Sequence, residues 1–453
     1  MRWYAVGAVV AAVVLALAYG PSYLGYDAAW ALVWGADLAG GHLPSYEAAF
    51  APTPHPLANL LAVPLSVFSD GGGGALGWLA FAGFGALVAG AWALGAEIGG
   101  VTGGALAALL VATRSDLGRE AAFGSVDLPF LALVVWAVFA AARRGPGSAL
   151  PLALLVLAGL LRPEAWGLSL AALAWAATTR GAPLGRLAVL AFAAPALWLL
   201  SDLAVTGDPL HSLHGTRDLA AALERPRGIG TALATLDDGL RDLIGTLALL
   251  AGVAGAIAAI AWKRTAARVA AAVVLLGVAG YALLGAAGLP VLFRYLLAPA
   301  TMLLVLAGGG IGAAIQGRRW VPAAGIAALL VASAPATARD LSRARDFTHL
   351  RADVHDDLRA VTSSAEFRSA AEACEPILVP GFRVRPFVRL DAGHDVEVGN
   401  LPDGRPGLLL TYADEVSEIV FNLGARGEVG RQAAPAGAQR VAANPSWEAY
   451  RVC

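Results

Sequence analysis

Long apolar runs separated by short charged loops occupy the chain up to residue 336. A helix that crosses a bilayer needs about 20 mostly apolar residues, and about eleven runs are candidates by that measure. They are Trp3–Tyr19, Leu76–Ile98, Val101–Thr113, Ala121–Ala142, Leu150–Leu161, Ala165–Ala177, Leu187–Val205, Leu243–Trp262, Val269–Ala287, Val291–Ile315 and Val321–Ala336. The pattern predicts an all-α polytopic membrane protein whose first apolar run is kept as a span rather than cleaved as a signal peptide.

Basic residues in the short loops predict the orientation. Cytoplasmic loops carry an excess of Lys and Arg. With the spans above, four basic loops fall on the same side as Arg2: Arg143–Arg144, Arg180 with Arg186, Lys263 with Arg264 and Arg268, and Arg318–Arg319. The N-terminus is therefore expected in the cytoplasm, with the protein in the plasma (inner) membrane and everything after Ala336 outside the cell.

The composition changes after residue 338 to that of a soluble domain, so we divide the chain into a membrane domain, 1–338, and an extracytoplasmic α/β domain, 339–453. Periodicity predicts helices and strands in the second domain. The expected helices are Arg339–Arg359, Ala365–Ala373 and Tyr412–Phe421, and the expected strands are Pro376–Pro380, Gly407–Thr411, Gln439–Ala443 and Trp447–Cys453. The two cysteines, Cys374 and Cys453, predict an extracytoplasmic disulfide, the alternative being two buried thiols.

Overall composition excludes several classes of protein. Hydrophobic residues make up 58% of the chain, charged residues 14%, and the formal net charge is -1. A soluble domain carries about 25% charged residues, and no basic field is available to recruit nucleic acid. A glycine-rich nucleotide loop with its lysine is also missing from the sequence, which argues against an ATP-driven pump.

Two long outer loops, 21–70 and 206–242, are the expected places for chemistry, because function tends to lie on loops held by a rigid scaffold. In the first, Tyr26 and Asp27 lie just beyond the end of the first span, and Pro56–Phe68 predicts an interfacial helix. A partly desolvated carboxylate such as Asp27 can act as a general base. It can equally be a helix cap or a solvated loop charge.

Several motifs, in this order and on the outer side, resemble the C-type glycosyltransferases (GT-C), among them protein O-mannosyltransferases and lipid A aminoarabinose transferases. The matching elements are Asp27 after span one, His55-Pro56-Leu57, Asp127 in Ser125–Pro129, Arg162 in Leu160–Glu164, and Arg294-Tyr295 in Phe293–Pro299. The resemblance covers roughly residues 1–340 and implies a GT-C-type bundle in which Asp27 is the catalytic base. The family's His-Pro-Pro-Leu element lacks one proline here, which makes that match degenerate.

The resemblance also implies a lipid-linked sugar donor, with membrane lipids around the bundle. A polyprenyl-phosphate sugar has its phosphate at the outer interface, where an arginine can bind it with two parallel hydrogen bonds. Arg294 and Arg162 are both candidates for this role, and Tyr295 accompanies Arg294. The alternatives for the arginines are snorkelling to the lipid headgroups or pairing with Glu164.

The remaining candidates concern the acceptor, the sugar or a metal. Acceptor or sugar contacts are expected among Tyr26, His55, Asp116, Asp127, Glu164, His211 and His214. Asp116 could also hold a divalent metal or be a solvated charge. His211 and His214 lie three apart and could bind a metal or a phosphate, although two ligands do not make a metal site. A mobile loop at 206–242 over the donor is the interpretation that we prefer.

Three functions follow from these features. The first is an inverting glycosyltransferase that moves a sugar from the lipid-linked donor to a glycan, lipid or protein acceptor. The second is a secondary transporter or lipid flippase, which would show inverted repeats and midplane charges. The third is a non-catalytic scaffold with an outer partner-binding domain. The charges collect at helix ends, which favours the enzyme.

Overall fold

The computed structural model describes residues 2–46, 48, 50–66, 73–262, 264–317, 334–392, 398–400, 406–422, 428–435 and 437–453. The contacts divide the chain into two units, which are described separately. The first comprises Met1–Gly20, His55–Ala58 and Trp78–Arg345, and the second comprises Pro21–Pro54, Asn59–Gly77 and Asp346–Cys453.

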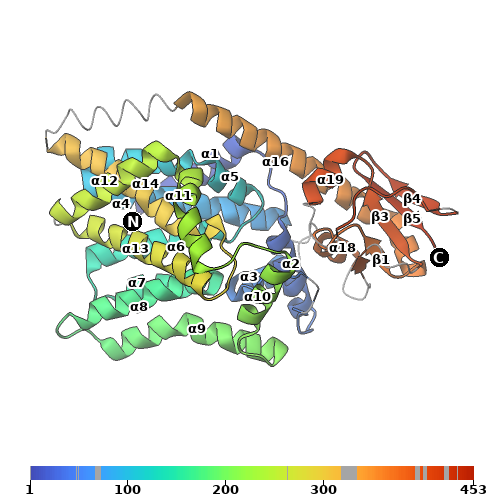
Figure 1. Ribbon diagram of the computed structural model, residues 1–453, viewed down its shortest axis with the longest axis horizontal. Coiled ribbons are helices and arrows are strands. Elements are labelled where there is room, and N and C mark those ends of the chain that lie inside the picture. Colours follow the sequence, from blue (N-terminus) through green and yellow to red (C-terminus); the bar gives the residue numbers. More distant parts are fainter. Residues whose placement is uncertain are drawn as a thin grey trace. The chain divides into compact units, whose positions relative to one another are not determined.

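The first unit is a bundle of mostly apolar helices (Figure 1). Its elements are α1 (Arg2–Tyr19), most of α4 (Gly73–Ala112), α5 (Ser115–Ala122), α6 (Asp127–Arg144), α7 (Ala149–Leu161), α8 (Glu164–Ala177), α9 (Leu184–Thr206), α10 (His211–Ala222), α11 (Ile229–Ile244), α12 (Thr246–Trp262), α13 (Thr265–Ala286), the 3₁₀ helix η1 (Phe293–Leu296) and α14 (Leu297–Gln316). Among the described residues, five helices are long and apolar enough to cross a membrane, or six if the bent pair α11 and α12 forms one span. The chain is a multi-pass membrane protein.

Most predicted spans correspond to helices, with shifted ends. The run Ala121–Ala142 is divided between α5 and α6, and the run Leu243–Trp262 begins in α11 and continues as α12 after Gly245. Helices α7 and α8 have 13 and 14 residues, fewer than the roughly 20 that a straight span needs, so the expected total of eleven spans stays a prediction. Lys263, Arg318–Arg319 and most of Val321–Ala336 lie outside the described residues.

Glycine explains the break that separates two of the predicted spans. Gly99 and Gly100 leave helical geometry inside α4, and Gly100 has a φ of 66°, which an L side chain rarely adopts. A Cβ on Gly99 would lie 2.1 Å from the carbonyl oxygen of Gly309 in α14. The glycines therefore allow the backbones of α4 and α14 to pack closely.

Helices α10 and α11 occupy most of the predicted outer loop 206–242, and its movement over the donor stays a prediction. The segment of α10 is rich in polar residues and shows no apolar stripe, so its sequence is typical of a loop. Its helix is anchored instead by side-chain bonds to the end of α9, which are described below.

The second unit contains the helices and strands of the C-terminal segment together with most of the first outer loop. Its elements are α2 (Tyr26–Ala39), most of α3 (Pro56–Leu65), much of α16 (Ala334–Thr362), α17 (Ala365–Ala373), β1 (Ile377–Val379), α18 (Arg385–Ala392), β2 (Val398–Asn400), β3 (Leu408–Tyr412), α19 (Glu415–Phe421), β4 (Gln439–Ala443) and β5 (Trp447–Arg451). The strand order is β2-β1-β3-β5-β4. Strand β1 pairs in parallel with β2 and β3, and β5 pairs antiparallel with β3 and β4.

Helix α2 completes the core of this unit. Ala29 is fully buried in one cluster with Val354 of α16, Val388 of α18 and Trp447 of β5. Further along α2, Oδ2 of Asp37 lies 3.9 Å from Nη2 of Arg389 in α18. The first outer loop, expected as part of the membrane domain, thus shares a hydrophobic core with the C-terminal segment.

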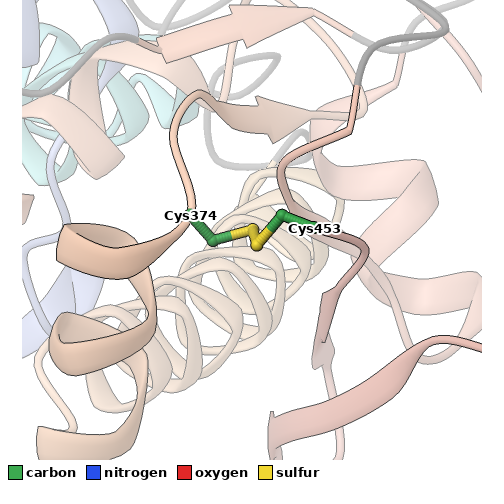
Figure 2. Close-up of a disulfide and its surroundings, with 2 residues drawn as sticks. All are labelled: Cys374 and Cys453. Atoms are coloured by element: carbon green, nitrogen blue, oxygen red, sulfur yellow. A yellow bond between two sulfur atoms is a disulfide. The ribbon is translucent and has the colours of Figure 1, made fainter.

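A disulfide joins Cys374 and Cys453, as the sequence predicts (Figure 2). Cys374 follows α17 and precedes β1, and Cys453 follows β5. The bond therefore closes the α/β segment between its first and last strands.

Candidate functional site

Three chain segments of the first unit bring charged residues together. Asp127 is the first residue of α6, Arg162 lies between α7 and α8, and Arg294 lies in η1 just before α14. Helix α6 packs against α7 and α14. Arg162 has extended backbone geometry and Pro163 starts the next turn, a position that proline favours because its missing N–H is not needed there.

These residues form a buried ionic cluster. Arg162 pairs through Nη1 with Asp127, and its Nε and Nη2 donate to Oε1 of Glu164 at 3.0 and 2.7 Å. Arg294 approaches the other oxygen of Asp127, with Nη2 3.3 Å from Oδ2. Asp127 therefore lies between two guanidinium groups, an arrangement that offsets the cost of burying its charge.

The two arginines differ in exposure. The side chain of Arg162 is 5% exposed, whereas that of Arg294 is 33% exposed. Arg162 also lies over the rings of Phe130 and Tyr295, at 5.8 and 5.4 Å from their centroids. Arg162 is thus held on several sides by carboxylates and rings, while Arg294 presents part of its guanidinium to the surroundings.

Glu120 of α5 also belongs to this cluster, although it was not predicted as a site residue. Burial raises the pKa of Glu120 to about 8, and the neighbouring charge of Asp127 adds to the shift. Its Oε2 is buried without a hydrogen-bond partner among the described residues. Burial thus favours the protonated form of this carboxyl, and the two arginines pair with Asp127 and Glu164 instead.

His55, from the His-Pro-Leu element, belongs to the same unit as the ionic cluster. It acts electrostatically on Asp127, and its ring meets Trp198 of α9 edge-on at 5.9 Å. Trp198 in turn meets Trp166 of α8 at 5.7 Å. These rings form an aromatic wall beside the ionic cluster.

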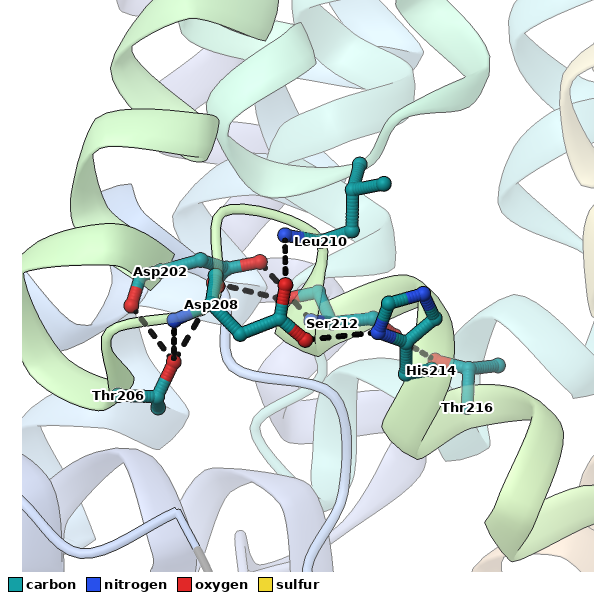
Figure 3. A network of polar contacts seen from close by, with 7 residues as sticks. All are labelled: Asp202, Thr206, Asp208, Leu210, Ser212, His214 and Thr216. Atoms are coloured by element: carbon teal, nitrogen blue, oxygen red, sulfur yellow. Dashed lines mark hydrogen bonds and ion pairs between the residues drawn. The ribbon is translucent and has the colours of Figure 1, made fainter.

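A polar network fixes the end of α9 to the start of α10 (Figure 3). Asp202 accepts from the backbone N and the hydroxyl of Ser212, both at 2.9 Å. Asp208 accepts from the backbone N of Leu210 at 2.9 Å, and its other oxygen lies 2.7 Å from Nδ1 of His214. His214 is thus engaged by a carboxylate of its own loop.

The metal site considered for His211 and His214 has no third ligand in the structure. Among the described residues, no group of three or more His, Cys, Asp or Glu side chains could hold a metal ion. Asp116, the other metal candidate, pairs with Arg119 within α5.

Asp27 and Tyr26 lie in the first turn of α2, in the second unit. Gly25 is the N-cap residue, so Asp27 is not the cap that the alternative interpretation proposed. The hydroxyl of Tyr26 donates to the carbonyl oxygen of Phe50 at 2.7 Å, and its ring meets Phe382 edge-on at 5.7 Å. Burial raises the pKa of Tyr26. These contacts fix the turn that carries Asp27.

The fold of the whole chain matches that of two solved membrane enzymes. ArnT from Cupriavidus metallidurans, solved bound to undecaprenyl phosphate, aligns with a TM-score of 0.57 at 12% identity over 100% of this chain and 98% of ArnT. The archaeal oligosaccharyltransferase AglB from Archaeoglobus fulgidus, in complex with an inhibitory peptide and a dolichol-phosphate, aligns with a TM-score of 0.52 at 13% identity over 92% of this chain and 70% of AglB. The fold is that of the GT-C glycosyltransferases. No protein-family model and no curated protein matches the sequence.

On this GT-C fold, five of the expected site residues come together in one cluster: His55, Asp127, Arg162, Glu164 and Arg294. Tyr295 contacts it through Arg162. Asp116 pairs with Arg119 and His214 with Asp208 instead, and His211 is the first residue of α10. Tyr26 and Asp27 belong to the other unit.

Proposed function

We propose that the chain is a membrane glycosyltransferase that moves a sugar from a polyprenyl-phosphate donor to a glycan, lipid or protein acceptor. The observation that carries the proposal is the buried ionic cluster around Asp127 and Arg294, found on a GT-C fold. ArnT binds undecaprenyl phosphate and AglB binds a dolichol-phosphate, which supports a lipid-linked donor here.

Arg294 is the proposed ligand of the donor phosphate. It is the more exposed of the two arginines and contacts Asp127 at 3.3 Å, so it can turn toward an incoming phosphate without leaving a carboxylate alone. As the bond from the anomeric carbon to the phosphate oxygen breaks, negative charge grows on the phosphate. A guanidinium bound to the phosphate stabilises that growing charge more than it stabilises the intact donor.

Arg162 is proposed as a positioning residue. Its donors already serve Asp127 and Glu164, so direct phosphate binding would displace one of these carboxylates. By holding Asp127, Arg162 also sets where Arg294 lies.

Asp27 is the proposed general base. It would take the proton of an acceptor hydroxyl while that oxygen attacks the anomeric carbon and polyprenyl phosphate leaves from the opposite face. This displacement inverts the anomeric configuration. The reaction would occur on the outer face, with the N-terminus in the cytoplasm and the plasma (inner) membrane around the bundle.

Binding of undecaprenyl phosphate to the purified chain in lipid nanodiscs tests the donor site without knowledge of the sugar. We expect the lipid phosphate to raise the unfolding temperature of the wild type, because a ligand of the folded state stabilises it. Arg294→Ala should lose this shift, whereas Arg241→Ala, which removes a surface arginine of α11, should keep it. An equal shift in both variants would remove Arg294 from donor binding. Failure of the wild type to bind would favour the transporter or scaffold.

A further inference from the structure

A cavity of about 440 Å³ lies within the second unit, and the proposed mechanism does not use it. None of the residues of the ionic cluster lines it. Its walls come from the segment before α2, the first residues of α4, and helices α16, α17 and α18. The volume falls in the range of about 300–1,000 Å³ that is typical of small-ligand sites.

Three rings line the cavity. Tyr23 and His355 lie 5.3 Å apart, and His355 and Phe387 lie 4.7 Å apart. Burial lowers the pKa of His355 to about 3, so this ring is uncharged at neutral pH. These rings are therefore an aromatic and neutral part of the lining, suited to the C–H face of a sugar ring.

Charged groups of both signs also line the cavity. Arg359 and Arg368 line it together with Asp356 and Asp391. Asp391 accepts from the hydroxyl of Thr362 and lies in the field of both arginines. Two guanidinium groups against two carboxyls leave no formal charge, so the lining does not select an anion.

The chemistry of this lining matches a neutral polyol. Guanidinium groups only donate hydrogen bonds and carboxylates only accept them, so neighbouring hydroxyl groups can satisfy both at once. The hydroxyl of Ser363, which donates to the carbonyl oxygen of Arg359 at 2.6 Å, keeps its lone pairs as acceptors in the lining. Aromatic rings and planar polar groups in one lining give a ring-shaped ligand a surface for its C–H face and partners for its hydroxyl groups.

The cavity is also near Asp27 along the chain. Leu24, which lines it, precedes Asp27 by three residues, so their Cα atoms are at most about 11 Å apart. We propose that this cavity binds a neutral saccharide unit of the acceptor. Its role as an acceptor subsite rests on the proposed function, whereas the binding itself does not.

Saccharide binding can be measured on the full chain in lipid nanodiscs, which avoids sugar-based detergents. The probes are disaccharides of mannose, glucose, galactose and arabinose. Saturation-transfer NMR measures their binding to the protein. Ser363 is an exposed residue of the lining, so Ser363→Trp places a large ring in the cavity. Glu366→Trp places the same ring at an exposed position of α17 that does not line the cavity. Arg368→Ala and Arg343→Ala form a second pair, since Arg343 is 79% exposed on α16 and does not line the cavity.

We expect one disaccharide to bind the wild type, with an affinity loss of at least about tenfold in Ser363→Trp and Arg368→Ala and no loss in the two controls. If no probe binds at millimolar concentration, or if Ser363→Trp binds like the wild type, the saccharide site is wrong. Octyl glycosides of the same sugars separate the sources: tighter binding indicates a lipid-borne acceptor, and equal binding indicates a glycan without a lipid.

Undecaprenyl phosphate binding in the same samples separates this proposal from the transferase. Saccharide binding without donor binding would leave the cavity assigned and contradict the transferase. Binding of undecaprenyl phosphate without binding of any saccharide would support the transferase and contradict the saccharide site.

Discussion

Nη2 of Arg294 lies 3.3 Å from Oδ2 of Asp127, whose other oxygen is paired with Arg162. One carboxylate thus holds two guanidinium groups of unequal exposure. In the sequence the two arginines look alike, because both stand at helix ends. Their different exposure in the structure indicates different roles. It predicts that Arg162 matters mainly for folding and Arg294 mainly for the donor.

Replacing Arg162 should be costly for stability. Arg162→Met leaves Asp127 and Glu164 with less compensation in a buried site, and breaking a buried pair from one side costs about 3–5 kcal/mol in the free energy of unfolding. Arg241→Met should stay within about 0.5 kcal/mol, because Arg241 is 42% exposed. Reversible unfolding in mixed micelles measures both variants. A loss in Arg162→Met no larger than in the control would contradict the structural role of the buried pair.

Glu120 predicts a pH dependence of stability. The carboxyl of Glu120 has its ordinary pKa of 4.5 in the unfolded chain, whereas burial raises this pKa to about 8 in the folded chain. Between these values the folded state binds more protons, so stability from this group falls as the pH rises through the window and its penalty is complete above about 8. Glu120→Gln should therefore gain stability relative to the wild type at high pH. Glu366→Gln on the exposed face of α17 is the control, and parallel pH profiles for all three proteins would refute the assignment.

His355 predicts the opposite slope on the acid side. Its pKa is lowered from 6.5 to about 3, first by burial and then by Arg351. Below about 6.5 the unfolded chain takes up a proton that the folded chain refuses, so stability is lost as the pH falls toward 3. His355→Phe keeps a ring against Phe387 and Phe421 and should flatten this slope. His349→Phe, at an exposed position of the same helix, should not, and tryptophan fluorescence during unfolding distinguishes them.

Removing the disulfide should weaken the C-terminal segment. The bond spans 79 residues, and closing a loop of that size restricts the unfolded chain by about 4–5 kcal/mol in the chain-entropy treatment, with measured losses of about 2–5 kcal/mol. The double variant Cys374→Ser, Cys453→Ser should become sensitive to proteolysis, and reduction should do the same to the wild type. Reduction should leave the double variant unchanged. Full protease resistance of the reduced wild type would be the contrary result.

The sequence predicts elements well where a periodic pattern coincides with a single burial face. Helix α17, which buries Phe367, Ala370 and Ala371, begins and ends where it was expected. Strand β4 also has the expected bounds, although none of its residues is fully buried. Helix α2 was not predicted, because it is buried on most sides and so shows no polar face that would mark a helix. Strand β2 has three residues, too few for an alternation to appear.

The candidate site shows the same limit. The sequence predicts that Asp127, Arg162 and Arg294 lie at the outer ends of different helices, because charged residues are costly inside the bilayer. Their pairing across 35 and 167 positions depends on how α6, α7 and α14 pack, which no local pattern encodes. Glu120 was missed for this reason. The one available signal was a carboxylate shortly before the Ser125–Pro129 motif.

The most direct test of the transferase is turnover with a panel of polyprenyl-phosphate sugars and an envelope extract as acceptor. Release of polyprenyl phosphate is followed for the wild type, Asp27→Asn and Asp237→Asn, the last removing a carboxylate that is 62% exposed on α11. We expect release by the wild type and Asp237→Asn, and a loss of at least about 10²-fold in Asp27→Asn, as for removal of a general base. Equal release by folded Asp27→Asn would contradict the role of Asp27, and no release by folded wild type from any donor would contradict the transferase itself.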